Sequence, residues 1–298
     1  MIYCGDSLEL MKTLETGSVD AVIADPPYNI GKASWDKIPK YLEWCREWIT
    51  EAARIMKRQG SFWCFHSDPL VLADIAKIIE GEGKPQLNWV TWDKYNGSPG
   101  GIQFIMNRSK IGRPEGNEKR TIDQDAEYIT YHAESPIAGW ITAERDKQGL
   151  LRNDIDMRLG YVRKSNKARG TELCRRWEEG SSIPSEYDIA RLSELFGSNC
   201  PAAPTFNNPG KVSSVWQFPP AKPNGHPTPK PVELIRRIVE TTTNPGDVIL
   251  DPFAGSGTTG VACIRTHRKY ILIEKDPKYV AIIEHRIKQT QPPLMMAL

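Results

Sequence analysis

The sequence predicts an α/β fold, a doubly wound and mostly parallel sheet interrupted by an inserted, partly helical region. Three observations support this prediction. Apolar runs of strand length alternate with helical patterns at both ends of the chain, which is typical of a parallel sheet covered on both faces. A glycine-rich turn follows a strand pattern near the C-terminus. The alternation itself breaks between residues 135 and 215.

The N-terminal half of the chain supplies the first strands and helices of the predicted sheet. Residues 19–24 (VDAVIA) form a continuous apolar run ending at Asp25, as expected of a buried strand. A helical pattern follows over 39–57, and Gly60 is expected to close that helix. The other elements expected in this half are a strand at 61–65, a helix at 70–79 and strands at 87–92 and 128–131.

The region from 135 to 215 carries a concentration of basic residues. Between 158 and 176 there are seven lysines and arginines and one acid, Glu172, which fits a segment that contacts phosphates. A solvated surface loop is the alternative interpretation. Two helical patterns, at 171–179 and 185–196, indicate a helix–turn–helix-like pair or a plain helical hairpin without DNA contact. The residues expected to bind DNA are Arg163, Lys164, Lys167 and Arg169.

The α/β order returns after this insertion and includes a possible ligand loop. Gly255, Gly257 and Gly260 satisfy G-x-G-x-x-G between a strand at 248–250 and a helix at 258–265. Such glycines allow a tight turn and let the backbone approach a ligand at a helix N-terminus. Glu274 ends the next strand, where its carboxylate could accept hydrogen bonds from ribose hydroxyls. The pattern therefore predicts a site for an adenosine-containing ligand, although a purely structural turn would use the same glycines.

Other elements complete the C-terminal part. They are a helix at 231–243, a strand at 270–273 and a helix at 277–288. The glycine turn starts at Asp251, and only 48 residues run from there to the last residue, too few for a whole nucleotide-binding sheet. The remaining strands must come from the N-terminal half. We therefore predict three parts: 1–134, the inserted region 135–215, and 216–298.

The turn Asp25-Pro26-Pro27-Tyr28 lies directly after the first buried strand. Ligands of open α/β sheets bind just outside the carboxyl ends of strands. The two prolines fix the backbone and hold Asp25 and Tyr28 in a set relation. Asp25 and the carbonyl of Pro26 could each accept an N–H from an exocyclic base amine, which would turn the nitrogen lone pair outward. Tyr28 offers an aromatic face for an extruded base. A rigid turn with Asp25 as a helix cap is the alternative.

The composition argues against a diffusely basic protein, a metal protein and a membrane protein. A net charge of +2 argues against a diffusely basic protein. None of the six cysteines forms a C-x-x-C pair, so no zinc or other metal site is expected. No apolar run approaches the roughly 18 residues of a membrane span and no signal-peptide pattern is present, so we expect no membrane association and a cytoplasmic protein.

Together these motifs resemble the β-class amino-methyltransferases of DNA. The matching segments are Asp25 to Tyr28, Asp251-Pro-Phe-Ala-Gly-Ser-Gly-Thr, His226-Pro-Thr-Pro-Lys230-Pro231 and Gly5-Asp6-Ser7. In this class the catalytic motif precedes the target-recognition region and the cofactor motif follows it, and this sequence has that order. The resemblance covers roughly 1–133 and 215–290. It implies a Rossmann-like methyltransferase fold with permuted motifs, and site-specific methylation of an adenine 6-amino group in duplex DNA.

The resemblance also implies a role for each matching residue. Asp25, Pro26, Pro27 and Tyr28 would hold and activate a flipped base. The cofactor would be S-adenosylmethionine, with Glu274 at its ribose and Asp6 near its adenine ring. Thr228 and Lys230 would lie near its methionine carboxylate. The glycine-loop residues expected to line it are Asp251, Phe253, Gly255, Gly257 and Thr258.

Several alternatives stay open at this point. The same fold could methylate the 4-amino group of cytosine, although Asp at position 25 favours adenine within the family. A nucleotide-binding or DNA-binding protein without methyl transfer is a more distant alternative, but it would not need Asp25 to Tyr28 or the basic insertion. Methylation of cytosine at carbon 5 is discounted because no cysteine follows a proline. A restriction partner and a homodimer are both compatible with the sequence.

Overall fold

The computed structural model describes seven stretches of the chain. These are residues 1–31, 36–94, 126–133, 136–161, 173–178, 184–200 and 214–290, with only the backbone described at Pro136 and Glu186. The expected DNA-binding residues Arg163, Lys164, Lys167 and Arg169 lie outside these stretches. Their assignment therefore stays a prediction.

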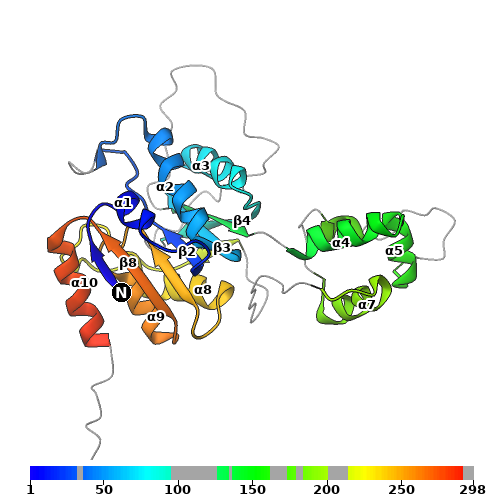
Figure 1. The fold of residues 1–298 in the computed structure, drawn as a ribbon. Coiled ribbons are helices and arrows are strands. Elements are labelled where there is room, and N and C mark those ends of the chain that lie inside the picture. Colours follow the sequence, from blue (N-terminus) through cyan, green and yellow to red (C-terminus); the bar gives the residue numbers. More distant parts are fainter. Residues whose placement is uncertain are drawn as a thin grey trace, which may run out of the picture.

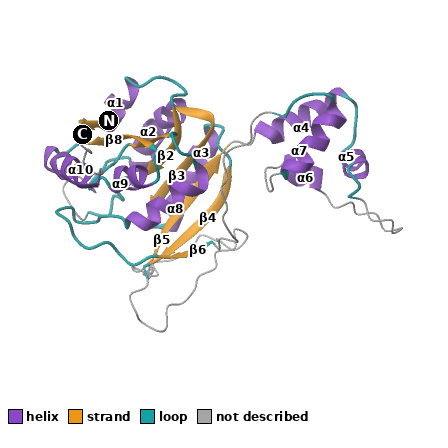
Figure 2. Cartoon of the chain, turned by 90° about the horizontal axis from the view of Figure 1, so that it is seen from below, coloured by secondary structure: helices purple, strands orange, loops and turns teal. Residues whose placement is uncertain are grey.

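Eight strands of the described residues form one twisted sheet (Figures 1 and 2). Its order is β1-β8-β7-β2-β3-β5-β4-β6. Within this sheet β5 runs antiparallel to its neighbours β3 and β4, and the other pairs of neighbouring strands are parallel. The bounds are β1 Ile2–Cys4, β2 Val19–Ala24, β3 Met56–His66, β4 Gln86–Asp93, β5 Ala126–Ala133, β6 Val215–Gln217, β7 Val248–Asp251 and β8 Lys269–Glu274. The predicted mostly parallel α/β sheet is confirmed.

Helices cover both faces of this sheet. One face packs against α1 Ser7–Lys12, α2 Tyr41–Ile55 and α3 Pro69–Gly81, and the other against α8 Val232–Thr242, α9 Thr258–Arg265 and α10 Pro277–Thr290. Alternation along β2 explains the two layers. Val22 points into the first apolar cluster and Ile23 into the second, and both are at least 98% buried.

The inserted region folds as a helical group with its own core. Its helices are α4 Pro136–Lys147, α5 Arg152–Arg158, α6 Leu173–Glu178 and α7 Glu186–Phe196. Ile137, Ile155, Trp177 and Leu192 are buried together in a cluster that shares no residue with the clusters of the sheet. Figures 1 and 2 draw these helices as a group beside the sheet.

Most predicted elements are present, with one instructive error in the N-terminal half. The helix expected over 39–57 ends at Ile55, and β3 starts at once at Met56. Gly60 therefore lies inside the strand instead of closing the helix. A Cβ on Gly60 would stand 2.9 Å from the carbonyl oxygen of Asp20, at an irregularity in the β2–β3 register. Gly60 is thus needed for close backbone approach.

Sequence patterning missed the short elements β1, α1 and β6 and the two helices α4 and α5. The three residues of β1 or β6 are too few to show a period. α4 has one apolar set, Ile137, Trp140 and Ile141, and its C-terminal half is mostly polar, so the apolar pattern is too short to show a helical period.

The buried imidazole of His132 on β5 makes folding stability depend on pH. Its Nδ1 lies 2.9 Å from the carbonyl oxygen of Lys84 and its Nε2 lies 2.6 Å from Oγ1 of Thr130, as suits a neutral ring. Burial lowers the pKa of His132 from 6.5 to about 4. In the unfolded chain the His132 imidazole becomes protonated below pH 6.5, whereas in the folded chain it becomes protonated only near pH 4.

We expect the free energy of unfolding to fall as pH drops from 6.5 to 4, with His132 contributing on the order of 3 kcal/mol of that loss. His132→Gln keeps one donor and one acceptor but does not titrate. Urea unfolding of both proteins across this range measures the difference. Parallel stability curves would contradict a neutral buried His132.

Candidate functional site

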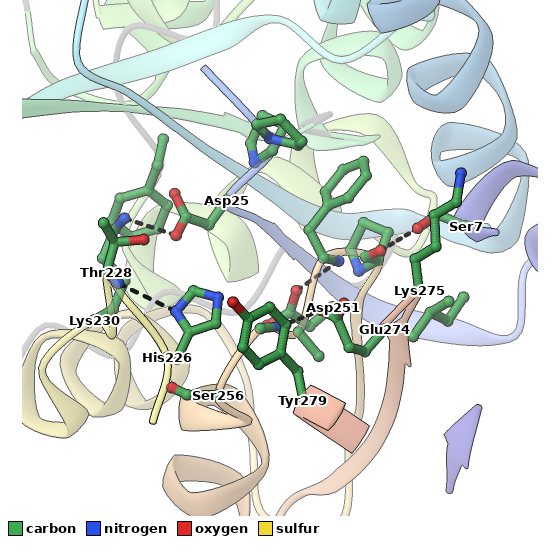
Figure 3. A pocket seen from close by; sticks show the side chains of 18 of the residues that line it. Ser7, Asp25, His226, Thr228, Lys230, Asp251, Ser256, Glu274, Lys275 and Tyr279 are labelled. Carbon is green, nitrogen blue, oxygen red and sulfur yellow. Dashed lines mark hydrogen bonds and ion pairs between the residues drawn. The ribbon is translucent and has the colours of Figure 1, made fainter. Parts of the chain in front are cut away.

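A cavity opens at the carboxyl ends of β2, β7 and β8, with a volume of about 750 Å³ (Figure 3). Its walls come from both ends of the chain. The turn after β2 contributes Asp25 to Tyr28, and the turn after β7 contributes Asp251 to Ser256. The register Ala21↔Ile249 and Val22↔Leu250 makes these two turns neighbours. The carboxyl edge of the sheet is where open α/β folds bind ligands.

The Asp-Pro-Pro-Tyr turn is held rigidly by hydrogen bonds. The hydroxyl of Tyr28 lies 2.7 Å from Oδ1 of Asp25, and the hydroxyl of Tyr41 donates to the carbonyl of Pro27 at 2.7 Å. Asn29 follows in the left-handed region at φ 57°, and its N–H donates to the buried carboxylate of Asp36 at 2.6 Å. Backbone and side-chain contacts therefore fix this turn before any ligand arrives.

The aromatic ring of Tyr28 is supported from one side. His66 at the end of β3 lies 4.7 Å from it, centroid to centroid, and its Nδ1 accepts the N–H of Asp68 at 2.9 Å. Burial lowers the pKa of His66, which keeps the imidazole neutral. Burial and the negative charge of Asp25 raise the pKa of Tyr28, so its hydroxyl keeps its proton.

The glycine turn has the backbone geometry that its sequence predicts. Gly255 and Gly257 adopt φ values of 51° and 76°. A Cβ on Gly255 would lie 3.0 Å from Nε2 of His226, and one on Gly257 would lie 2.9 Å from Cγ2 of Ile283. Side chains at these positions would therefore fill the turn or push α10 away from it.

Two carboxylates stabilise this turn from within. Asp251 accepts the hydroxyl of Thr259 at 2.5 Å and the N–H of Phe253 at 3.0 Å, and burial raises the pKa of Asp251 to about 7. Glu274 accepts the N–H of Gly255 at 2.8 Å, and burial raises its pKa as well. Both residues line the cavity; Glu274 is half-buried, whereas Asp251 is 5% exposed and is hydrogen-bonded to Phe253 and Thr259.

Lys230 is directed at the Asp-Pro-Pro-Tyr turn. Its Nζ lies 2.6 Å from Oδ2 of Asp25, 3.1 Å from Oε2 of Glu127 and 3.2 Å from the hydroxyl of Tyr28 (Figure 3 draws the pair with Asp25). The residue is 8% exposed. Its backbone carbonyl also accepts the hydroxyl of Thr258 at 3.1 Å, which ties this segment to the glycine turn.

The other predicted site residues lie around the cavity rim. Asp6 caps α1 by accepting the N–H of Leu8 at 3.1 Å, and Thr228 is exposed. Phe253 packs against Trp48 edge-on at 5.1 Å between ring centroids. All the predicted catalytic and cofactor residues except Gly257 line this one cavity, and Gly257 lies in its glycine turn. The four predicted DNA-binding residues lie outside the described part of the chain.

Sequence reasoning missed several residues that line the site. Glu127 is the one acid in the strand AEYITYHA, whose eight residues are all buried, and an acid in such a strand was the available signal. Trp44 and Trp48 belong to the apolar stripe of α2 and could not be told from core residues by period alone. His226 packs on Tyr279 at 4.5 Å between ring centroids, beside Gly255.

Among the described residues, no group of three or more His, Cys, Asp or Glu side chains is arranged to hold a metal ion. No helix in this part of the chain is both long and apolar enough to cross a membrane.

Comparison with known proteins connects this cavity to one family. A family model described as DNA methylase matches residues 19–285. DNA adenine methyltransferase YhdJ of Escherichia coli K12 is 28% identical, over 94% of this chain and 79% of that protein. Type II methyltransferase M.HpaI of Haemophilus parainfluenzae is 27% identical, over 96% of this chain and 73% of that protein.

Solved structures share the fold. The complex of M1.HpyAVI with SAM has a TM-score of 0.54 and 23% identity, covering 96% of this chain and 98% of that one. The cytosine-N4-specific PvuII DNA methyltransferase has a TM-score of 0.55 and 18% identity, covering 96% and 85%. At these identities the likeness extends to the fold alone.

We expect Gly257→Ala to destabilise the protein more than Gly17→Ala. Both glycines have φ near 70°, but a Cβ at Gly17 would meet nothing within 4 Å, while one at Gly257 would meet Ile283. Both substitutions cost about 1–2 kcal/mol of backbone strain, and steric overlap with Ile283 adds about 1–3 kcal/mol in Gly257→Ala. Thermal unfolding of the two variants measures this difference; equal losses would mean that α10 moves aside freely.

Proposed function

This chain belongs to the DNA methylase family, and from that premise we propose that it transfers a methyl group from S-adenosylmethionine to the 6-amino group of adenine in duplex DNA. One observation carries the proposal. The turn containing Asp25 and Tyr28 and the glycine turn with Glu274 open into the same cavity of about 750 Å³. A base and a methyl donor bound there would be adjacent.

The residues of the Asp-Pro-Pro-Tyr turn suit the activation of an exocyclic amine. Such an amine is a weak nucleophile because its lone pair is delocalised into the ring. A carboxylate at Asp25 and the carbonyl of Pro26, each accepting one N–H, favour a pyramidal nitrogen with its lone pair directed at the donor. The rigid backbone and the fixed ring of Tyr28 supply the positioning on which an in-line transfer depends.

The glycine turn and its surroundings fit an adenosine-containing donor. Bare backbone at Gly255, where a Cβ would reach His226, leaves room for close approach. Glu274 presents a carboxylate for ribose hydroxyls, and Phe253, Trp44 and Trp48 supply apolar surface for a purine. When bound, S-adenosylmethionine supplies an electrophilic methyl group on a sulfonium that leaves as a thioether.

Adenine is favoured over cytosine as the target base. The relative YhdJ is named as a DNA adenine methyltransferase. This chain also carries Asp at position 25, the residue that within the family favours adenine over cytosine. The fold does not discriminate between the two target bases, because the structure of PvuII methyltransferase, a cytosine-N4 enzyme by name, matches this fold as well as that of M1.HpyAVI does. Methylation at the cytosine 4-amino group is therefore the second candidate.

DNA binding is assigned to the inserted region. Its sequence holds seven basic residues and one acid between 158 and 176, and a strong local positive charge attracts the phosphate backbone. We include Arg163, Lys164, Lys167 and Arg169 in this assignment. Incubation with labelled S-adenosylmethionine and mixed-sequence duplex DNA, followed by sequencing of methylated positions, tests the whole proposal. Methylated cytosine would favour the second candidate, and no labelled DNA would overturn both.

We expect Asp25→Ala to lower the rate of methyl transfer by about 100-fold or more, because a preorganised acceptor of the reacting amine is lost. Affinity for S-adenosylmethionine should change by only about a few-fold, since Asp25 faces the amine. Asp74→Ala, on the exposed face of α3 with Lys77 as its partner, is the matched control and should behave as wild type. Single-turnover kinetics and calorimetry make the comparison; near-normal turnover by Asp25→Ala would remove Asp25 from the reaction.

We expect Glu274→Gln to weaken S-adenosylmethionine binding by about 1.5–3 kcal/mol, because charge-assisted hydrogen bonds to a ribose are lost. Glu284→Gln, an exposed residue of α10, is the control. Calorimetric titration without DNA gives both affinities. Equal affinities for the two variants would mean that another group holds the ribose.

A further inference from the structure

Lys94, Glu127, Lys230 and Asp25 form a row of alternating charge, and the last three line the cavity. Lys94 contacts Oε1 of Glu127 at 2.9 Å, Glu127 contacts Lys230 through Oε2 at 3.1 Å, and Lys230 contacts Asp25 at 2.6 Å. Their side chains are between 8% and 26% exposed. Because charges this poorly hydrated are costly unless compensated, each depends on its neighbour in the row.

Both oxygens of the Asp25 carboxylate are already engaged by the protein. Oδ1 lies 2.7 Å from the hydroxyl of Tyr28, and Oδ2 accepts from Lys230. The three partners of the Lys230 ammonium match its three hydrogens. The nitrogen of Lys230 thus stands within hydrogen-bond distance of Asp25, where the proposed reaction puts the nitrogen of the target amine.

An ammonium bound to Asp25 opposes the proposed reaction. Methyl transfer makes the target nitrogen more positive, so a full positive charge on the same carboxylate raises the energy of the transition state. Lys230 must therefore give up its contact with Asp25 when the amine arrives. The remaining counter-charge within reach is Glu127, which Lys230 already contacts.

We propose that the Lys230 ammonium holds the amine position on Asp25 until a base arrives, and that Glu127 is the positioning residue that keeps Lys230 once the amine replaces it. This inference rests on the proposed methyl transfer. Lys94 supports it from the far side by binding Oε1 of Glu127, while Oε2 faces Lys230 and accepts the hydroxyl of Tyr28 at 3.0 Å. Glu127 acts through Lys230 and does not touch the reacting atoms.

The protonation of the row agrees with this geometry. Burial by itself would lower the pKa of Lys230, but Asp25 and Glu127 outweigh it and raise that pKa above its ordinary value. Burial likewise opposes the charge on Glu127, yet Lys230 and Lys94 hold the pKa of Glu127 well below its usual range. Lys230 is therefore cationic, and Glu127 anionic, throughout the neutral range.

Replacing Glu127 by Gln leaves Asp25 as the one carboxylate in contact with Lys230 among the described residues. The ammonium should then stay on Asp25, and kcat should fall about 100-fold at pH 7.5, with KM for DNA within about three-fold. In this variant the lowering of the Lys230 pKa by burial is opposed by one carboxylate instead of two, so the pKa of Lys230 is lower than in wild type. Deprotonation would release Asp25, and kcat of Glu127→Gln should rise between pH 8 and 10, where wild type stays flat.

A second substitution separates this role from a merely structural one. In the double variant Glu127→Gln/Lys230→Met the blocking charge is absent, so kcat should recover at least about ten-fold over Glu127→Gln and lose its alkaline rise. Glu233→Gln, which removes an exposed partner of Arg236 on α8, is the control for the chemical change and should leave kcat unaltered. Side-chain NMR of the lysines gives an independent reading, because one lysine, absent in Lys230→Met, should show a lower pKa in Glu127→Gln.

Three results would overturn the inference: a double variant no faster than Glu127→Gln, a pH profile of Glu127→Gln parallel to wild type, or an unchanged lysine pKa. Loss of fold is checked by thermal unfolding of every variant and would appear as slow kinetics without the alkaline rise. A wild-type protein that methylates no DNA would instead overturn the proposed function, an outcome that does not depend on any variant.

Discussion

The pairing of β2 with β7 is the constraint on which the rest of the structure depends. It joins Val22 to Leu250 across 228 residues of sequence, and it sets the turns after the two strands side by side at one edge of the sheet. Closing so long a loop costs conformational entropy, which apolar burial on both faces offsets. Because the strands are parallel, both turns leave from the same end, and one cavity is lined by the Asp-Pro-Pro-Tyr turn and the glycine turn together.

A second consequence of the sheet is the buried charge row. β5 runs antiparallel beside β3, and this places Glu127 within reach of Lys230, which enters from the segment before α8. An apolar set of the same volume would often be as stable as these ion pairs. In the mechanism we propose, their value lies instead in controlling which group contacts Asp25 before a base arrives. The helices of the insertion have a separate core, so substitutions there need not disturb this arrangement.

The sequence by itself determined the class of fold and most of the site. Strands such as β2 were predictable because both of their faces are buried and their apolar run is continuous. The glycine turn was predictable because only glycine tolerates the backbone conformation at Gly257. Asp25 to Tyr28 stood out because two prolines after a buried strand fix a turn whose chemistry is readable locally. These are short-range properties, determined by neighbours within a few residues.

Only the tertiary structure decided what each charge faces. Lys230 is predicted to lie near the methionine carboxylate of the cofactor, and that placement stays a prediction; the structure adds that its ammonium contacts Asp25 and Glu127, residues 205 and 103 positions away. Glu127, an acid on the fully buried strand β5, has its counter-charges in Lys94 and Lys230. Gly60 looked like the end of a helix until the backbone of Asp20 approached it. Such contacts arise from strand order and register, and no local pattern encodes the partner that a side chain meets across a sheet.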